Sequence, residues 1–256
     1  MEILDHNREA WDKLVEEGNI WTKPVDSQVI EDAKNGIWSI VLTPTKPVPS
    51  DWFGMLARKK VLCLASGGGQ QGPVLAAAGA EVTVLDNSQS QLDRDLLVSR
   101  RDKIDLRIEL GDMRDLSRFD SESFDLIFHP VSNCFTDDVN KVWKECYRVL
   151  RKGGALLAGF CNPITYIFDL NEWDENQNLS VRYTIPYCDL DQLPKEQLKV
   201  RIENKEPIEY GHSLQDQIGG QIDAGFIITG FYEDSAGGDL LDPYINTFIA
   251  TRAIKP

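Results

Sequence analysis

The sequence predicts an α/β protein with a doubly wound, mainly parallel sheet. Short apolar runs recur along the chain, and amphipathic segments with helical spacing separate them. Three consecutive glycines, residues 67–69, come shortly after the first apolar run. The last two apolar runs are joined by a glycine-containing loop with no room for a helix, which indicates an antiparallel hairpin. Strands that alternate with helices in this rhythm form parallel sheets covered by helices.

The predicted strands are short apolar runs that end at polar residues or glycine. Those expected to lie parallel are residues 61–64, 81–85, 106–110, 124–128 and 155–160. The hairpin is expected at residues 226–232 and 245–251. Right-handed crossovers place the carboxyl ends of parallel strands at one edge of the sheet. The loops that follow the first four strands are therefore expected to converge there.

Local end signals place the first helices of the sheet region. Pro73 suits the first turn of a helix, and Gly79 is suited to ending it. Ser88 and Gln91 form a capping box, which predicts a helix from this point to about Lys103.

Two later helices are predicted from apolar spacing. Asp137 or Asp138 is expected to cap the first of them. Its apolar face is formed by Val139, Val142, Trp143, Cys146, Val149 and Leu150. The second opens near Ser213 and ends at Gly225, with an apolar stripe of Leu214, Ile218 and Ile222.

The pattern divides the chain into an N-terminal cap (1–58), a ligand-binding core (59–160), an insertion over the active edge (161–212), and a C-terminal helix and hairpin (213–256). The cap is expected to begin with a helix at residues 7–17 and contains Trp11, Trp21, Trp38 and Trp52. These tryptophans are expected to cover a bound ligand, and covering the edge of the sheet is the alternative. The insertion contributes Tyr166, Phe168, Trp173, Tyr183 and Tyr187.

The glycine turn predicts a nucleotide-like ligand. A strand, a glycine turn and a helix aim free backbone N–H groups at a ligand, and the missing side chains permit close approach. The second strand leads into Asp86, roughly 20 residues after the first glycine, where an acid meets ribose hydroxyls. Residues 67–72 also fit G-x-G-x-x-G, but a glycine triplet satisfies many patterns, so this match is weak by itself.

Composition excludes several classes of partner. The formal net charge is −14 and no basic stripe is present, which disfavours a nucleic acid or an anionic membrane surface. The N-terminus lacks a signal-sequence pattern. The cysteines form no C-x-x-C pair, and no His or Cys spacing suits a metal. A cytoplasmic protein with reduced cysteines and without a bound metal is expected; its oligomeric state is left open.

Further motifs follow in a fixed order. The third strand ends in Gly111-Asp112-Met113, the fourth opens with Phe-Asp-Leu-Ile at residues 124–127, and the segment Val-Leu-Arg-Lys-Gly-Gly at 149–154 leads into the fifth. Over residues 59–160 and again over 224–252, the chain resembles the class I S-adenosylmethionine-dependent methyltransferases. The resemblance implies a Rossmann-like seven-stranded sheet whose last strand is antiparallel and inserted beside the sixth.

The resemblance also implies roles for individual residues. The glycine turn is expected beneath the methionine part of S-adenosylmethionine, Asp86 at the ribose hydroxyls, and Asp112 with Met113 beside the adenine. The expected cofactor-binding residues are Ala65, Ser66, Gly67, Gly68, Gly69, Gln70, Gln71, Asp86, Asn87, Gln91, Gly111, Asp112, Met113, His129 and Pro130. The expected catalytic residues are His129, Asn133 and His212.

The first strand departs from the family pattern. Where the family carries an acid and then a glycine, this chain has Cys63 and Ala65. The family's acid steadies the glycine turn and the ammonium group of the cofactor. The ammonium therefore needs another acceptor, for which Gln70, Gln71 and backbone carbonyls are the candidates.

Each assigned residue has a purely structural alternative. Asp86 is also placed to cap the following helix, and Asp112 to form a turn after Gly111. His129 is equally consistent with a buried core histidine, and His212 with an ordinary residue before a helix cap.

The expected activity is transfer of a methyl group to a small-molecule acceptor. The reaction is an in-line displacement, in which positioning is worth ~7 kcal/mol or more. A general base, His129 or His212, is needed only if the acceptor binds protonated. The Asn/Asp-Pro-Pro-Tyr motif of many amino-group methyltransferases is absent, because residues 129–132 read His-Pro-Val-Ser. This disfavours an exocyclic amine or a nucleic-acid base. The alternatives are a non-catalytic cofactor-binding protein and a nicotinamide-dependent oxidoreductase.

Overall fold

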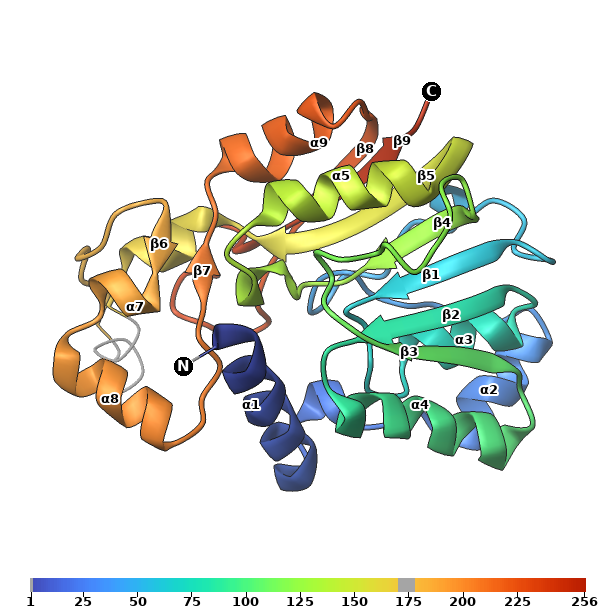
Figure 1. Cartoon of the computed structure of the whole chain (residues 1–256), viewed down its shortest axis with the longest axis horizontal. Coiled ribbons are helices and arrows are strands. Elements are labelled where there is room, and N and C mark those ends of the chain that lie inside the picture. The colour runs from blue at the N-terminus through green and yellow to red at the C-terminus, as the bar shows by residue number, and fades with distance from the viewer. Residues whose placement is uncertain (1, 170–177) are drawn as a thin grey trace.

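The computed structural model describes residues 2–169 and 178–256, so Trp173 of the predicted insertion lies outside the described residues. One seven-stranded sheet organises the molecule (Figure 1). Its strands are β1 Lys60–Leu64, β2 Glu81–Asp86, β3 Leu106–Leu110, β4 Phe124–His129, β5 Leu150–Cys161, β8 Ile227–Asp234 and β9 Phe248–Ile254.

The order of the strands is β3-β2-β1-β4-β5-β9-β8. Strands β1 to β5 pair in parallel, and β9 pairs antiparallel with both β5 and β8. This arrangement confirms the predicted sheet and the position of its last strand. The hairpin strands begin one and three residues later than predicted, and β5 begins at Leu150 instead of Ala155.

Alternating residues of the central strands point into two separate cores. Val61 and Cys63 of β1 face one core, which also contains residues of α2 (Ser27–Lys34), α3 (Gln71–Ala77) and α4 (Gln89–Asp102). Leu62 and Leu64 face the other core, together with α5 (Val139–Val149). Figure 1 shows α5 on one face of the sheet and α3 and α4 on the other. Helices on both faces explain why these strands are apolar throughout.

The predicted helix caps are confirmed at the start of α4 and α5. The Ser88 hydroxyl accepts from the Gln91 backbone N–H at 3.1 Å. The side chain of Asp138 accepts from the Lys141 N–H at 3.0 Å, so Asp138 is the cap of α5 and Asp137 is not. The N-terminal helix α1 spans Ile3–Glu17 and begins four residues earlier than predicted.

The helix predicted near Ser213 has the opposite face buried. It consists of a π-helical turn, η5 (Gln215–Gly219), followed by α9 (Gly220–Asp223). Leu214 and Ile222 are exposed, whereas Gln217 and Gln221 are buried. The Gln217 amide forms two hydrogen bonds with Asn133, and Gln221 Oε1 accepts from the Thr251 hydroxyl at 3.0 Å. The predicted apolar stripe is therefore wrong, because these hydrogen bonds and the π turn set the orientation.

The predicted insertion forms short elements beside the carboxyl ends of the strands (Figure 1). They are η4 Pro163–Ile167, β6 Tyr187–Cys188, α7 Asp189–Gln192, α8 Lys195–Glu203 and β7 Tyr210–Gly211. The remaining short turns are η1 Ile20–Thr22, η2 Ser50–Trp52 and η3 Asn133–Phe135. The Asn7 amide of α1 exchanges two hydrogen bonds with the backbone of Ile208, at 2.8 and 3.0 Å. The two flanking segments are therefore joined to each other.

Within the described ranges, no helix combines the length and the apolar character needed to cross a membrane.

Candidate functional site

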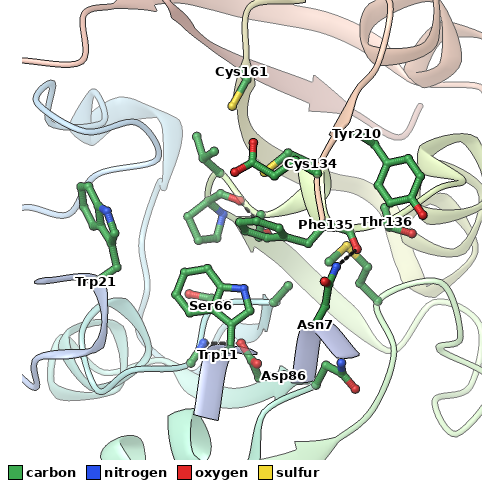
Figure 2. Close-up of a pocket in the computed structure, with 18 of the residues that line it drawn as sticks. Asn7, Trp11, Trp21, Ser66, Asp86, Cys134, Phe135, Thr136, Cys161 and Tyr210 are labelled. Carbon is green, nitrogen blue, oxygen red and sulfur yellow. Dashed lines mark hydrogen bonds between the residues drawn. The ribbon is translucent and has the colours of Figure 1, made fainter. Parts of the chain in front are cut away.

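A cavity of about 600 Å³ opens at the carboxyl ends of β1, β2 and β4 (Figure 2). Its lining includes most of the residues predicted to bind the cofactor. These are Ala65, Ser66, Gly67, Gln70, Gln71, Asp86, Asn87, Gln91, Gly111, Asp112, Met113 and Pro130. The predicted residues Gly68, Gly69 and His129 do not line it. The topology thus brings together loops that are far apart in the sequence.

Close packing explains the glycines of the turn. A Cβ added to Gly67 would lie 2.7 Å from Gln91 Cβ and 3.0 Å from Asp86 Oδ2. A Cβ added to Gly68 would lie 2.6 Å from the Trp21 carbonyl oxygen. Gly68 has a φ of 109°, which residues with a side chain rarely adopt. These two positions therefore hold the turn against both α4 and the N-terminal segment.

Asp86 joins the glycine turn to the start of α4. Its Oδ2 accepts from the Gly67 N–H at 2.9 Å, and its Oδ1 accepts from the Ser88 N–H at 2.9 Å. Burial raises the pKa of Asp86, while these N–H groups oppose the rise. Each oxygen keeps a second lone pair, and the residue lines the cavity, so the carboxylate has capacity for ligand hydroxyls.

Asp95 of α4 is a residue that the sequence analysis missed. Its side chain is completely buried, and its Oδ2 accepts from the Gly68 N–H at 3.1 Å. Burial raises the pKa of Asp95 well above its ordinary value, opposed by the N–H groups of Gly69 and Gly68. The Cys63 thiol stands where the family has its acid; burial raises its pKa, and the nearby Asp95 carboxyl raises it further. A helix thus supplies a carboxyl to a turn whose strand lacks one.

Ala65, which stands where the family has a glycine, has a left-handed backbone with a φ of 47°. Its N–H donates to the Leu85 carbonyl at 2.7 Å, which fixes this conformation. Ala65→Gly is therefore expected to raise the free energy of unfolding by roughly 1 kcal/mol, measured by chemical denaturation. Ala76→Gly within α3 is the control, and its free energy of unfolding is expected to fall by roughly 1 kcal/mol. A loss of stability in Ala65→Gly would show that the residue is not strained.

Asp112 lies at the edge of the cavity in an ion-pair network. Its carboxylate pairs with Arg114 at 2.7 Å, and Arg114 also pairs with Asp137. Asp112 Oδ1 further accepts from the Arg114 backbone N–H at 2.9 Å, which is the turn role given as its alternative. Met113 lies beside it in the cavity lining.

His129 is buried in the core and does not reach the cavity. Its Nδ1 donates to the Leu64 carbonyl at 2.9 Å, and its ring packs edge-on against Trp143. Burial lowers the pKa of His129 to about 4, so the imidazole is neutral at pH 7. This placement corrects the expectation that His129 binds the cofactor or acts as a base, and it matches the structural alternative.

Asn133 and His212 also lie outside the cavity lining. Asn133 is buried and forms its amide pair with Gln217, with both hydrogen bonds at 3.0 Å. His212 Nε2 donates to the carbonyls of Asn133 and Thr136, at 3.1 and 2.9 Å. Burial lowers the pKa of His212. The Asn133 amide and His212 Nε2 are used in these contacts, which fix η3, and neither residue lines the cavity.

The two flanking segments complete the cavity. The N-terminal segment contributes Glu2, Ile3, Leu4, Asn7, Trp11, Trp21 and residues 41–44, and the insertion contributes Cys161, Thr165, Tyr166, Glu209 and Tyr210. Trp38 and Trp52 instead pack on Phe53 and Tyr232, so for these two the alternative of covering the sheet applies. Tyr183 and Tyr187 are buried behind the lining, in a cluster with Tyr166. Of the predicted aromatic residues, Trp11, Trp21 and Tyr166 therefore face the cavity.

Comparison with solved structures supports the fold. An S-adenosylmethionine-dependent methyltransferase from Mesorhizobium loti has a TM-score of 0.59 at 17% identity, covering 80% of this chain and 94% of that chain. A Burkholderia thailandensis 1,6-didemethyltoxoflavin-N1-methyltransferase, with bound 1,6-didemethyltoxoflavin and S-adenosylhomocysteine, has a TM-score of 0.60 at 12% identity. It covers 99% of this chain and 89% of that chain.

Comparison of sequences shows the family. The family model described as "Methyltransferase domain" matches residues 62–158. A Bacillus subtilis (strain 168) protein named uncharacterized methyltransferase YbaJ is 57% identical over 253 residues, covering 99% of this chain and 98% of that protein. The cavity also fits the cofactor of the family, because Asp86 meets Gln91 at the glycine turn, and the buried Gln91 Oε1 has no hydrogen-bond partner among the described residues. The chain belongs to the class I S-adenosylmethionine-dependent methyltransferases, and S-adenosylmethionine is its cofactor.

Proposed function

We propose that this methyltransferase acts on a small molecule bound between its two flanking segments. The observation that carries the proposal is that one cavity runs from the glycine turn to Trp11, Tyr166 and Glu209. Its volume of about 600 Å³ is in the range of small-molecule sites, ~300–1,000 Å³. The net charge of −14 disfavours a nucleic-acid acceptor. The bound small molecule in the Burkholderia structure is consistent with such a site.

The protein's contribution to the reaction is positioning. S-adenosylmethionine supplies a methyl group on a positively charged sulfur, which is already a good leaving group. We propose that Asp86 binds the ribose hydroxyls and that Met113 lies against the adenine. The rings of Trp11 and Phe135 pack edge to face, with their centroids 5.2 Å apart, and exclude water from the acceptor side.

We further propose that Asp95 supplies the support that an acid on the first strand gives in the family. The carboxyl reaches the turn from α4 and accepts from the Gly68 N–H. Gln70 adds a second anchor, because its Nε2 donates to the carbonyls of Ile20 and Lys23 at 2.9 and 3.0 Å. The turn is thereby tied to the N-terminal segment.

Hydrogen exchange tests whether the flanking segments enclose the site. Binding of S-adenosylhomocysteine is expected to slow exchange at residues 65–72, 86–91 and 111–113, and also at 2–21 and 205–211, because ordering around a ligand closes these segments. Helix α8 lies outside the lining and serves as the internal control. Protection confined to the first three ranges would place the acceptor elsewhere.

A further inference from the structure

Glu209 is an ionisable group of the cavity that the cofactor does not require. Its Oε2 accepts from the Tyr166 hydroxyl at 2.8 Å, and its backbone N–H donates to Asp189 Oδ2 at 2.8 Å. Among the described residues, no hydrogen bond is made to Glu209 Oε1. The carboxylate is therefore held in place with one oxygen available to a ligand in the cavity.

The contacts of Tyr166 place Glu209 on the acceptor side. The Tyr166 hydroxyl lies 3.7 Å from Cys161 Sγ as well as 2.8 Å from Glu209 Oε2. Figure 2 shows Cys161 and Cys134 toward one side of the view and Asp86 and Ser66 toward the other. Glu209 is thus next to Cys161 and separated from the residues that bind the cofactor.

Within the part of the chain that the structure describes, the cavity lining offers Glu209 no free cation. Arg114 is the positively charged side chain among the described lining residues. It is paired with Asp112 at 2.7 Å and with Asp137. Arg201, behind the lining, pairs with Asp189 at 3.3 Å. Burial and Asp189 raise the pKa of Glu209, while Arg201 and the Tyr166 hydroxyl lower it. An anionic acceptor would meet an unpaired carboxylate here, whereas a cationic acceptor would neutralise it.

Aromatic residues line the cavity that Glu209 also lines. Trp11 comes from α1, Phe135 from η3, Tyr166 from η4 and Tyr210 from β7. Figure 2 shows the rings of Trp11, Phe135 and Tyr210 at the cavity. The faces of such rings attract a cation, and a nearby carboxylate adds a charged hydrogen-bond acceptor.

We propose that the methyl acceptor is an aliphatic amine, bound with its nitrogen at Glu209; this rests on the proposed small-molecule function. An aliphatic amine is protonated at neutral pH, so it needs both a counter-charge for binding and a base for reaction. An amine attached to a heteroaromatic ring is not protonated and needs neither. The absence of the Asn/Asp-Pro-Pro-Tyr motif, which disfavours exocyclic amines, is consistent with this assignment.

The proton and electron balance gives Glu209 a defined role. The ammonium group of the acceptor donates one proton to the Glu209 carboxylate, which frees the lone pair of the nitrogen. That lone pair forms the new N–C bond, and the S–C bond of S-adenosylmethionine breaks with its electron pair remaining on sulfur. The products are a methylated ammonium, S-adenosylhomocysteine and a proton that Glu209 releases to solvent.

Matched sets of probes test the assignment. Each set shares one skeleton (2-phenylethyl, n-hexyl or cyclohexylmethyl) and differs only in its head group, which is an amine, an alcohol or a carboxylate. Binding to the protein saturated with S-adenosylhomocysteine is measured by calorimetry at pH 7. In at least one set, the amine is expected to bind tenfold or more tightly than the alcohol and the carboxylate.

Two variants assign the preference to Glu209. Glu209→Gln is expected to remove the preference for the amine while S-adenosylhomocysteine still binds. Glu206→Gln, on the same segment but outside the lining, is expected to retain it. If alcohols or carboxylates bind as tightly as amines, or if no probe binds, the amine assignment is rejected. The small-molecule proposal is still supported in that case if S-adenosylhomocysteine slows hydrogen exchange at residues 2–21 and 205–211. An unchanged preference in Glu209→Gln also rejects the role of this residue.

Discussion

Asp95→Ala is expected to lower the free energy of unfolding by about 0.5–1.5 kcal/mol, the usual net contribution of one hydrogen bond. Among the described residues, the N–H of Gly68 loses the carboxyl oxygen at 3.1 Å and keeps the Gln91 carbonyl, also at 3.1 Å. The glycine turn should loosen, so we expect weaker binding of S-adenosylhomocysteine as well. Denaturation and calorimetry on the same preparation measure both effects.

The control for this prediction is Asp93→Ala, which removes an exposed acid from the same helix. An Asp95→Ala protein as stable as Asp93→Ala, with unchanged affinity for S-adenosylhomocysteine, would show that Asp95 does not support the turn. Asp95→Asn separates charge from hydrogen bonding, since the amide keeps an acceptor oxygen but does not titrate.

The pH dependence of Asp95→Asn has a definite sign. The pKa of Asp95 is raised in the folded protein, so the folded state holds a proton that the unfolded state releases near pH 4. Wild-type stability should therefore fall relative to Asp95→Asn as the pH rises from about 4 through the raised pKa. The nearby Asp86 carboxylate also raises the pKa of Asp95, because two like charges repel.

The sheet and its cofactor edge could be predicted because their signals are local. Apolar runs such as residues 61–64, the glycine turn and the Ser88 cap each depend on neighbours a few residues away. Crossover handedness then determines which loops meet. The predicted residues of three separate loops consequently line one cavity.

The supporting and acceptor-side residues could not be predicted in this way. Asp95 is an acid in the middle of a helix, and it reaches the turn only because α4 packs beneath it. Glu209 belongs to a segment without periodicity, and its position depends on Asn7 and Tyr166, which are distant in sequence. One signal was present: a first strand without its acid requires a carboxyl from another element.

The histidine predictions failed for a related reason. His129 follows a strand at the correct edge of the sheet, but whether its ring turns toward the cavity or into the core depends on Leu64 and Trp143. The apolar stripe from Leu214 to Ile222 was misassigned because the amides of Gln217 and Gln221 find buried partners in Asn133 and Thr251. In both cases tertiary hydrogen bonds decide the orientation.

Asp86→Ala is expected to weaken binding of S-adenosylhomocysteine by about 1.5–3 kcal/mol, which is the usual worth of hydrogen bonds to a charged group. This corresponds to a roughly 10- to 150-fold increase in Kd. Part of the loss comes from the ribose hydroxyls, and part from the Gly67 N–H that Asp86 holds at 2.9 Å. The fold should persist, because Asp86 lies at the end of β2 and outside both hydrophobic cores.

Calorimetric titration of S-adenosylhomocysteine into the wild type, Asp86→Ala and Asp93→Ala tests most directly whether this cavity is the cofactor site. We expect tight binding to the wild type and to Asp93→Ala, and binding weaker by at least tenfold to a folded Asp86→Ala. Equal affinities in all three proteins would contradict the assignment of the cofactor to the edge formed by the glycine turn and Asp86.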